Sequence, residues 1–509
     1  MFPSEEGLIV PRFRARGRWW VVALGGWVVA LGVAVAGVLS SAAVAGIAGS
    51  PPAHAAATKR PNVVFVLTDD LSWNLVRYMS HIERMRRRGL TFTRYFVTDS
   101  LCCPSRSSIF SGRYPHDTGV FTNGGLDGGF QVFYARGEER STFATSLQGR
   151  GYGTGMMGKY LNGYLPRTLY VPPGWSEWDG AGNAYAEFNY NLNENGRLVH
   201  YGHQPADYLT DVLADKGTAF INSAAAAHRP FVLELATFAP HAPYTPAPRD
   251  AGDFPGLRAP RGPSFNRANV NAPAWLRAKP PLTPAQVAGI DTAFRLRARA
   301  VQAVDRLIAR IEATLRARGL SGRTYLVFSS DNGYHMGEHR LTPGKQTAFD
   351  SDIRVPLIVV GPGVPRGRTD RRLVENIDLR PTFSRLGGGR VPGSVDGHSL
   401  VPLLQGRRVR SWRRGVLIEH HGPDLDAADP DRPAPGSGNP TSYEALRIQG
   451  ALYVEYRDGE REYYDLRRDP YERVNAIGRL SRRRRAELHR VLVRLKRCHG
   501  ARSCWRAAR

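Results

Sequence analysis

Cys102, whose thiol is a reactive group, lies two residues before Pro104, a residue typical of the start of a helix. Ser105 and Arg106 come next, and Ser111-Gly112-Arg113 follow them. Pro104 is typical of the first turn of a helix, because the N–H that proline lacks has no partner there in any helix. Cys102 would then lie just ahead of the helix N-terminus, where unpaired N–H groups and the helix dipole favour an anion. The alternative interpretation is a buried cysteine pair in front of an ordinary helix.

Four short apolar runs have the length and composition of buried strands: residues 62–67, 231–236, 325–328 and 355–360. Helical patterns separate them, and the clearest is at residues 301–316, where apolar side chains recur every three or four positions. Buried strands that alternate with helices predict a large, mostly parallel sheet covered by helices on both faces.

Polar side chains stand where three of these strands end. Asp69 and Asp70 follow the first strand, His241 follows the second, and Asp331 and Asn332 follow the third. Ligands of open α/β sheets bind beyond the carboxyl ends of the strands, so we expect these side chains to converge. Three carboxylates and an amide oxygen suit Ca²⁺ or Mg²⁺. Taken singly, each pair would be interpreted as a helix cap or a turn.

The composition is that of a soluble globular protein with an unusual charge. The 509 residues allow two or three domains, with 42% hydrophobic and 23% charged residues and a net charge of +25. Such a surface attracts polyanions. No nucleic-acid-binding motif accompanies the charge, so nucleic acid is not an expected partner, whereas an anionic polysaccharide is a candidate. An arginine-rich composition without any polyanionic partner explains the charge equally well.

The N-terminal segment has the features of a targeting sequence. Arginines at 12, 14, 16 and 18 precede an apolar run at 19–48, and the triplet at 53–55 resembles a signal cleavage site. Residues 1–57 are therefore interpreted as an export signal or an N-terminal membrane anchor, with cleavage after Ala55 favoured. We expect the protein to be exported, either secreted or held in the cell envelope. No pair of adjacent arginines precedes the apolar run, so a twin-arginine export route is not indicated.

The C-terminal part differs in composition from the rest. Residues 422–440 are rich in Pro, Asp and Gly and are interpreted as a linker between a catalytic domain at 58–421 and a subdomain at 441–509. Two strand-like runs at 451–456 and 462–466 predict a hairpin. Outside the cell, Cys498 and Cys504 would pair, which leaves Cys103 as a packed core residue.

The tail from Arg479 combines an apolar helical stripe with a dense basic run at 482–485. The basic run predicts a docking surface for anionic polymers or envelopes. The alternative is that the stripe simply packs the tail onto the catalytic domain and leaves its arginines solvated. Both hold together if stripe and charges occupy different faces of the helix.

The stretch LCCPSRSSIFSGR at 101–113 resembles the signature of type I sulfatases, in which the first cysteine is oxidised to formylglycine. Similar segments occur at 63–70, 155–164, 172–179, 240–243, 330–363 and 463–472, so the resemblance covers about residues 60 to 477. It implies an alkaline-phosphatase-like sandwich, in which helices cover a large, mostly parallel sheet, plus a small C-terminal α+β subdomain. It also implies hydrolysis of sulfate esters by a formylglycine nucleophile made from Cys102.

The resemblance implies a role for each matching residue. One ion, Ca²⁺ or alternatively Mg²⁺, would be held by five positions: Asp69, Asp70, Asp331, Asn332 and the modified Cys102. Arg106 and Lys159 would steady the formylglycine and the sulfate. His241 and Lys345 would contact the sulfate and assist the leaving oxygen. A formylglycine-generating enzyme is an implied partner.

One departure from the family concerns the residues after the first active-site lysine. Many members carry a histidine two positions after that lysine, whereas Lys159 is followed by Tyr160, Leu161 and Asn162. Asn162 can form hydrogen bonds but cannot act as a base at neutral pH. The motif sequences GKYLNGY and SLCCPSR are most similar to those of the N-acetylglucosamine-6-sulfatase branch, which implies an aryl or sugar sulfate substrate.

Two other functions stay open. One is a phosphodiesterase or phosphonate hydrolase of the same superfamily, which a second metal with extra histidine ligands would favour. His335 and His339 are the nearest histidines to Asp331 in the sequence, and they are interpreted as a turn or a substrate wall. A non-catalytic polyanion-binding protein would use the basic surface alone, and Cys102 would be dispensable for it.

Overall fold

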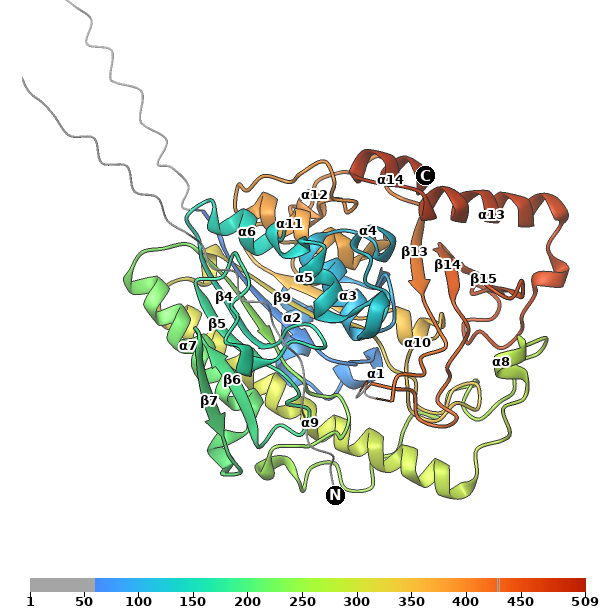
Figure 1. The fold of residues 1–509 in the computed structure, drawn as a ribbon, viewed down its shortest axis with the longest axis horizontal. Coiled ribbons are helices and arrows are strands. Elements are labelled where there is room, and N and C mark those ends of the chain that lie inside the picture. The colour runs from blue at the N-terminus through green and yellow to red at the C-terminus, as the bar shows by residue number, and fades with distance from the viewer. Residues whose placement is uncertain (1–59, 428, 430) are drawn as a thin grey trace, which may run out of the picture. The chain divides into compact units, whose positions relative to one another are not determined.

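A ten-stranded mixed sheet organises the chain (Figure 1). The computed structural model describes residues 60–427, 429 and 431–509. The strands, in their order across the sheet, are β11 (Arg368–Asp370), β2 (Leu90–Phe92), β10 (Leu357–Val360), β9 (Thr324–Ser330), β1 (Asn62–Thr68), β8 (Phe231–Ala236), β4 (Gly153–Lys159), β5 (Glu177–Ala181), β6 (Tyr190–Glu194) and β7 (Arg197–Tyr201). The order is not sequential, so the central strands are joined by crossovers that place helices on the faces.

The five central strands, β9, β1, β8, β4 and β5, are mutually parallel. β1 and β9 are buried along their full length, as strands covered on both faces should be. The strands that run in the opposite direction are β10 and β6, each of which pairs antiparallel with both of its neighbours. The mostly parallel sheet is therefore confirmed, although the apolar run at 355–360 forms an antiparallel strand beside β9.

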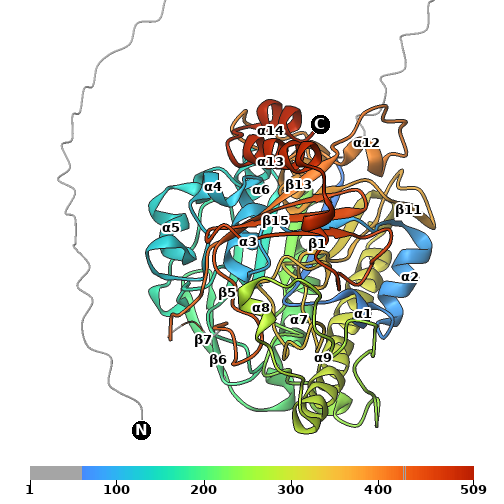
Figure 2. The same cartoon turned by 90° about the vertical axis from the view of Figure 1, so that its right-hand side faces the viewer.

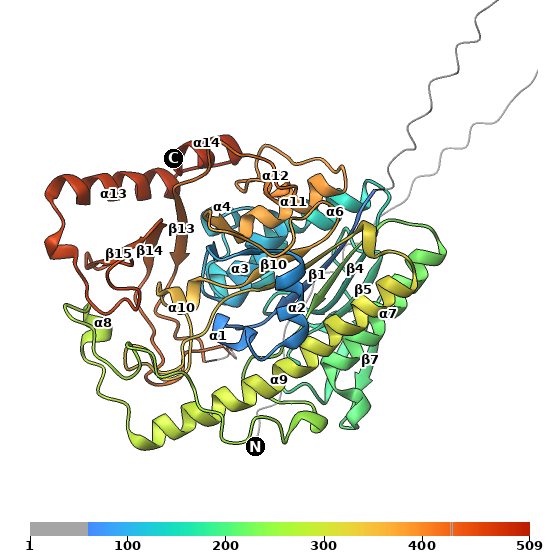
Figure 3. The same ribbon diagram turned by 180° about the vertical axis from the view of Figure 1, so that it is seen from behind.

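Two layers of helices cover the sheet. One face packs against α2 (Ser80–Arg88), α7 (Leu209–Ala226) and the long α9 (Pro284–Ala317), which Figure 3 shows crossing that side of the molecule. The predicted helix at 301–316 is the second half of α9. The other face packs against α3 (Cys102–Ser111), α5 (Gly129–Ala135), α6 (Phe143–Gln148) and α11 (Leu379–Leu386).

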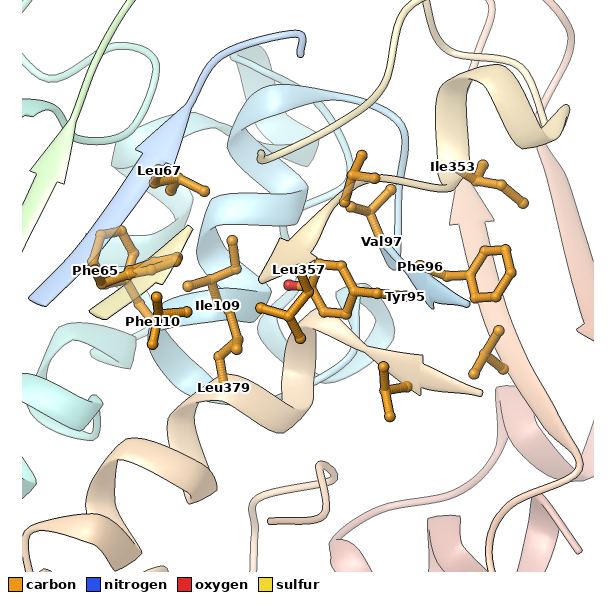
Figure 4. Close-up of a cluster of buried hydrophobic side chains, with 14 of the residues drawn as sticks. Phe65, Leu67, Tyr95, Phe96, Val97, Ile109, Phe110, Ile353, Leu357 and Leu379 are labelled. Carbon is orange, nitrogen blue, oxygen red and sulfur yellow. The ribbon is translucent and has the colours of Figure 1, made fainter. Parts of the chain in front are cut away.

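Shorter helices occupy the connections: α1 (Trp73–Val76), α4 (Pro115–Thr118), α8 (Ala274–Arg277), α10 (Asp350–Ile353) and α12 (Val401–Leu404). A two-stranded pair, β3 (Tyr95–Phe96) with β12 (Val374–Glu375), lies beside the α3 layer. Figure 4 shows how this layer joins the sheet, because Ile109 and Phe110 of α3 lie in one apolar cluster with Phe65 of β1 and Leu379 of α11. All these side chains are buried, so α3 is held rigidly against the central strand.

A second, antiparallel sheet forms the C-terminal part, seen edge-on in Figure 2. Its strands are β13 (Gly415–His420), β14 (Tyr443–Ile448), β15 (Ala451–Tyr456) and β16 (Arg461–Asp465), followed by α13 (Arg482–Lys496) and α14 (Ala501–Ala507). The hairpin of β15 and β16 is confirmed. β13 precedes residue 422 and pairs along its length with β14, which follows residue 440.

The tail packs onto this second sheet through its apolar stripe. Leu488, Leu492 and Leu495 of α13 are buried in a cluster with Leu417 of β13 and Leu446 of β14. Cys498 and Cys504 form a disulfide, as predicted. The sheet, the C-terminal strands and the tail all belong to one compact unit, which includes every described residue from Arg60 to Arg509.

Residues 1–59 lie outside the described part of the chain, and so does the interpretation of 19–48 as an apolar targeting run. Within residues 60–427, 429 and 431–509, no helix is both long and apolar enough to cross a membrane.

Candidate active site

Four neighbouring parallel strands deliver polar residues to one edge of the sheet. Asp69 and Asp70 follow β1, Asp331 and Asn332 follow β9, and His241 lies in the loop after β8. Thr68 and Ser330 are partners in register, so the two acidic pairs emerge side by side. The convergence expected from the sequence is thus present in the structure.

Lys159 reaches the same edge as the last residue of β4, beside β8. Its Nζ lies 2.6 Å from Oδ2 of Asp69, and both side chains are almost completely buried. Lys345 comes from the loop between β9 and α10. Its Nζ lies 2.8 Å from Oδ1 of Asp70 and 3.0 Å from Sγ of Cys102.

Cys102 is the first residue of α3, one position later in the helix than the sequence predicted. Pro104 lies in the first turn, and every residue of the helix is buried. The helix ends at Gly112, whose φ of 69° is left-handed, and a Cβ there would lie 2.9 Å from Val395. Helix α3 therefore begins in the site and ends against the core.

The Cys102 side chain is a free, buried thiol. Sγ donates to Oδ1 of Asp69 at 3.2 Å. Cys103 points away into the apolar core, and its backbone N–H donates to Asn123. The two adjacent cysteines are therefore in different environments, as predicted.

Arg106 lies one turn along α3 and is completely buried. Its Nε is 2.7 Å from Oδ2 of Asp331, and its Nη1 donates to the carbonyl of Lys159 at 2.8 Å. Arg106 therefore ties the helix to the ends of two strands, β9 and β4.

Asp431 is a site residue that the sequence analysis missed. It lies in the segment at 422–440 that was interpreted as a linker, yet its side chain is 1% exposed and reaches the centre of the site. Its Oδ1 is bound by Nε2 of His241 and lies 3.2 Å from Nζ of Lys345. No motif marks this aspartate, because the composition around it is that of a loop.

Asn162 is one of the residues that hold Asp431. Its Nδ2 donates to Oδ2 of Asp431 at 3.1 Å, and Nδ2 of Asn123 donates to the same oxygen at 3.0 Å. The position two residues after Lys159, where many family members carry a histidine, is Leu161, which is buried in the apolar core, and the next residue, Asn162, binds a carboxylate.

The charges of the site shift its pKa values in a consistent direction. Burial alone would lower the pKa of Lys159 and of Lys345, but Asp69 acts on the first and Asp431 with Asp70 on the second, so both pKa values lie well above the usual value. Both lysines are therefore charged at any physiological pH.

His241 responds in the same way. Burial would lower its pKa, but Asp431 and then Asp70 raise it above the usual value, which favours the protonated ring. Burial would raise the pKa of Asp431, but Lys345 and His241 hold it well below its usual range. For Cys102, burial and then the charges of Asp431 and Asp69 raise the pKa well above that of a free thiol, so the unmodified thiol stays protonated.

The donor set at this edge fits a divalent cation. Asp69, Asp70, Cys102 and His241 each offer a ligand atom within 4.8 Å of the others. Oδ1 of Asn332 is buried and has no hydrogen-bond partner, which a cation would supply.

The fifth expected ligand, Asp331, already has hydrogen-bond partners on both of its carboxylate oxygens. Besides Arg106 on Oδ2, its Oδ1 accepts the backbone N–H groups of Asp70 and Asn332. The remaining set is dominated by carboxylate and amide oxygens, which suits Ca²⁺ or Mg²⁺ better than a soft metal.

His335 and His339 do not join this group. Nδ1 of His335 lies 2.9 Å from the carboxylate of Asp352, and its Nε2 faces the carbonyl of Ser437. His339 faces Asn269 and stacks on Phe349. Both rings are thus used in loop packing.

A cavity of about 490 Å³ opens beside the site. Its lining includes Asp70, His241, Lys345 and Asp431, together with the rings of Tyr244 and Tyr334. Charged and aromatic side chains therefore both line the cavity.

Comparisons with known proteins identify the family of the chain. The profile of the Sulfatase family matches residues 61–389, and that of "N-sulphoglucosamine sulphohydrolase, C-terminal" matches residues 337–497. The N-acetylglucosamine-6-sulfatase of Homo sapiens is 35% identical over 479 residues, which cover 88% of this chain and 86% of the human protein.

Solved structures share the fold. One, described as a complex with its substrate D-glucosamine-2-N,6-O-disulfate, matches with a TM-score of 0.71 and 22% identity over 86% of this chain and 97% of its own. The phosphonate monoester hydrolase of Agrobacterium radiobacter matches with a TM-score of 0.63 and 20% identity over 84% and 94%. The fold is thus the alkaline-phosphatase-like sandwich that the resemblance implied. On the match of the family profile and of the human relative, this chain belongs to the sulfatase family and is a sulfuric ester hydrolase.

Proposed function

We propose that this sulfatase hydrolyses the sulfate ester of a sulfated sugar, using Cys102 after its conversion to formylglycine and one bound Ca²⁺. The observation that carries the proposal is the position of Cys102. It begins a buried helix, and Asp69 and Lys345 contact its Sγ. This places the reactive side chain beside both the acidic group and the fixed cations.

The chain's own residues supply the charges that the reaction needs. Negative charge develops on the oxygens of a sulfate ester, and preorganised cations beside it stabilise that charge. Lys159, Lys345 and Arg106 are buried and positioned by carboxylates, so they need no reorganisation. His241, whose pKa is raised, can donate a proton to the departing oxygen.

The two absent groups would complete this arrangement. A formylglycine hydrate would supply the nucleophilic oxygen at the position of Cys102. A Ca²⁺ ion held by Asp69, Asp70, Asp331, Asn332 and the modified Cys102 would supply positive charge beside it. The unpartnered Oδ1 of Asn332 supports this assignment.

A sugar sulfate is the substrate class that the cavity favours. Its volume of about 490 Å³ lies within the range of small-molecule sites. The human relative is named for a 6-sulfated N-acetylglucosamine, and a structural neighbour holds a sulfated glucosamine. We therefore propose 6-O-sulfated glucosamine units as the first substrates to test. We further propose that residues 1–57 export the enzyme and that a formylglycine-generating enzyme modifies it.

The phosphonate hydrolase alternative has less support. It shares only the fold, at 20% identity. The histidines that could hold a second metal, His335 and His339, face Asp352 and Asn269 instead.

A polyanion-binding role in addition to catalysis has a specific observation in its favour. A groove of about 920 Å³ beside α13 is lined by seven arginines and only two acids. The arginines are Arg94, Arg371, Arg372, Arg413, Arg414, Arg484 and Arg509. We propose that this groove and the exposed arginines of α13 dock anionic polysaccharide, as a surface separate from catalysis.

The two adjacent cysteines provide the test of the catalytic proposal. Mass spectrometry of the peptide that spans them should show a loss of roughly 18 Da at Cys102, from thiol to aldehyde, and none at Cys103. Cys102→Ala should abolish release of sulfate from N-acetylglucosamine-6-sulfate and from an aryl sulfate, whereas Cys103→Ala should retain it. An active preparation with unmodified Cys102, or an active Cys102→Ala variant, would contradict the proposal.

A further inference from the structure

Asp431 holds a position in the site that a substrate anion would need. Its carboxylate accepts four hydrogen bonds, two from charged groups, His241 and Lys345, and two from the amides of Asn123 and Asn162. The side chain is 1% exposed. Four donors around one buried anion make a complete anion-binding pocket.

The donors of that pocket have no capacity left. An ammonium group carries three protons, and Nζ of Lys345 faces three acceptors: Asp70 at 2.8 Å, Cys102 at 3.0 Å and Asp431 at 3.2 Å. The protonated ring of His241 carries two, and its nitrogens face the carbonyl of Ala242 and the carboxylate of Asp431. Neither residue can bind a sulfate oxygen while Asp431 stays in place.

We propose that Asp431 is an internal anion that occupies the subsite for the substrate's sulfate group and is displaced when the substrate binds. The inference rests on the proposed function, because it takes Lys345 and His241 to be contacts of that sulfate. Carboxylate and sulfate are alike in the property that matters here, since both present anionic oxygens to the same donors.

The displacement has a consequence for the product. Inorganic sulfate would be held strongly by Lys345 and His241, which line the cavity, if nothing competed with it. Asp431 is tethered beside these cations, so it competes at a high effective concentration. A sugar sulfate can offset this competition through contacts of its sugar ring with the cavity, whereas free sulfate has no such contacts. Asp431 thus favours the ester over the product.

The experiment measures binding of inorganic sulfate by titration calorimetry in wild type, Asp431→Asn and Asp429→Asn. Asp429 is the matched control, because it lies in the same segment and forms no hydrogen bond with Lys345 or His241. Its Oδ1 accepts from the backbone N–H of Asp431 and from Asn123, and the amide oxygen of an asparagine can keep both bonds. If the open state is a minor one, at most about 10% populated, Asp431→Asn should bind sulfate about tenfold tighter or more. Asp429→Asn should match wild type.

A second variant tests the same competition by weakening the contacts that hold Asp431 in place. Asn162→Ala removes one donor to Asp431 and leaves Lys345 and His241 intact, so it should also tighten sulfate binding, by less than Asp431→Asn. Inhibition of sugar-sulfate hydrolysis by inorganic sulfate should strengthen in parallel. If one of these two variants fails to fold, the other still tests the proposal.

Other results would overturn the inference. Unchanged sulfate affinity in Asp431→Asn would mean that the carboxylate does not compete. Weaker sulfate binding, with a lower kcat at constant KM, would make Asp431 a positioning residue for His241. The double variant Asp431→Asn with Lys345→Met distinguishes a failure of this inference from a failure of the proposed function. If the double variant still binds sulfate as tightly, sulfate binds elsewhere, and the assignment of the site fails as well.

Discussion

Lys159 offers a sharp test of the cation site, because it neutralises one of the carboxylates that would hold the ion. Its Nζ is 2.6 Å from Asp69, and the two side chains are 4% and 0% exposed. Replacing Lys159 by Met keeps the bulk of the side chain but leaves a buried carboxylate without its partner. Breaking a buried ion pair in this way costs about 3–5 kcal/mol of stability.

Calcium should reverse part of this loss. A cation at Asp69 and Asp70 restores the missing positive charge, and an ion at a hundredfold excess over its Kd stabilises the folded state by about 2.7 kcal/mol. Removing the ammonium also removes a repulsion on the ion, so Lys159→Met should gain more from calcium than wild type does. Unfolding midpoints measured in chelator and in calcium give both quantities.

The matched control is Arg113→Met. Arg113 forms its salt bridge with a single carboxylate, Glu138, at 2.6 Å, and neither residue belongs to the group of Asp69, Asp70, Cys102 and His241. It should lose stability without any added response to calcium. If Lys159→Met responds to calcium no more than Arg113→Met does, the acidic pair does not hold the ion and the assignment is refuted.

Three further outcomes are expected. Glu234 on β8 is buried without a hydrogen-bond partner, and burial raises its pKa to about 8. Because the buried side chain is neutral at acidic pH and must ionise as the pH rises, the free energy of unfolding should decline between about pH 4.5 and about pH 8. Glu234→Gln should remove this decline, worth about 1.4 kcal/mol per pH unit, and an unchanged pH profile of urea unfolding midpoints would contradict it. Asp331→Asn should lower bound calcium, measured by mass spectrometry of the metal, together with turnover, and full activity without metal would oppose the assignment. Changing the four arginines at 482–485 to Gln should lower the salt at which the protein leaves a heparin column and spare aryl sulfate turnover. The same change to the four arginines of α2 should have a smaller effect, and equal effects would mean that only total charge matters.

The sequence predicted the parts of the site that follow from strand patterns. Asp69, Asp331 and His241 could be placed because each follows an apolar run, and the ends of parallel strands share one edge. Lys159, Lys345 and Arg106 could be assigned only through the family resemblance, since lysines in glycine-rich turns are usually solvated.

Asp431 could not be predicted, and the reason is physical. A loop has no periodic pattern that ties its side chains to a face of the molecule, and Pro, Asp and Gly are common in solvated linkers. Only the three-dimensional packing brings residue 431 to Asn123 and Asn162. For the same reason the pairing of β13 with β14 across that segment was not anticipated.

The complete burial of Cys102 constrains when it can be modified. In the folded protein no atom of this residue is accessible, so an enzyme that oxidises it must act before α3 docks against the sheet. The groups that close over Cys102 include Asp431, roughly 330 residues downstream, and synthesis of that length takes about 15 to 65 seconds at typical rates. If Cys102 is converted to formylglycine as proposed, the fraction of active enzyme depends on whether oxidation precedes folding of the chain around Cys102. A host that folds the chain faster than it oxidises Cys102 would produce a stable but inactive protein.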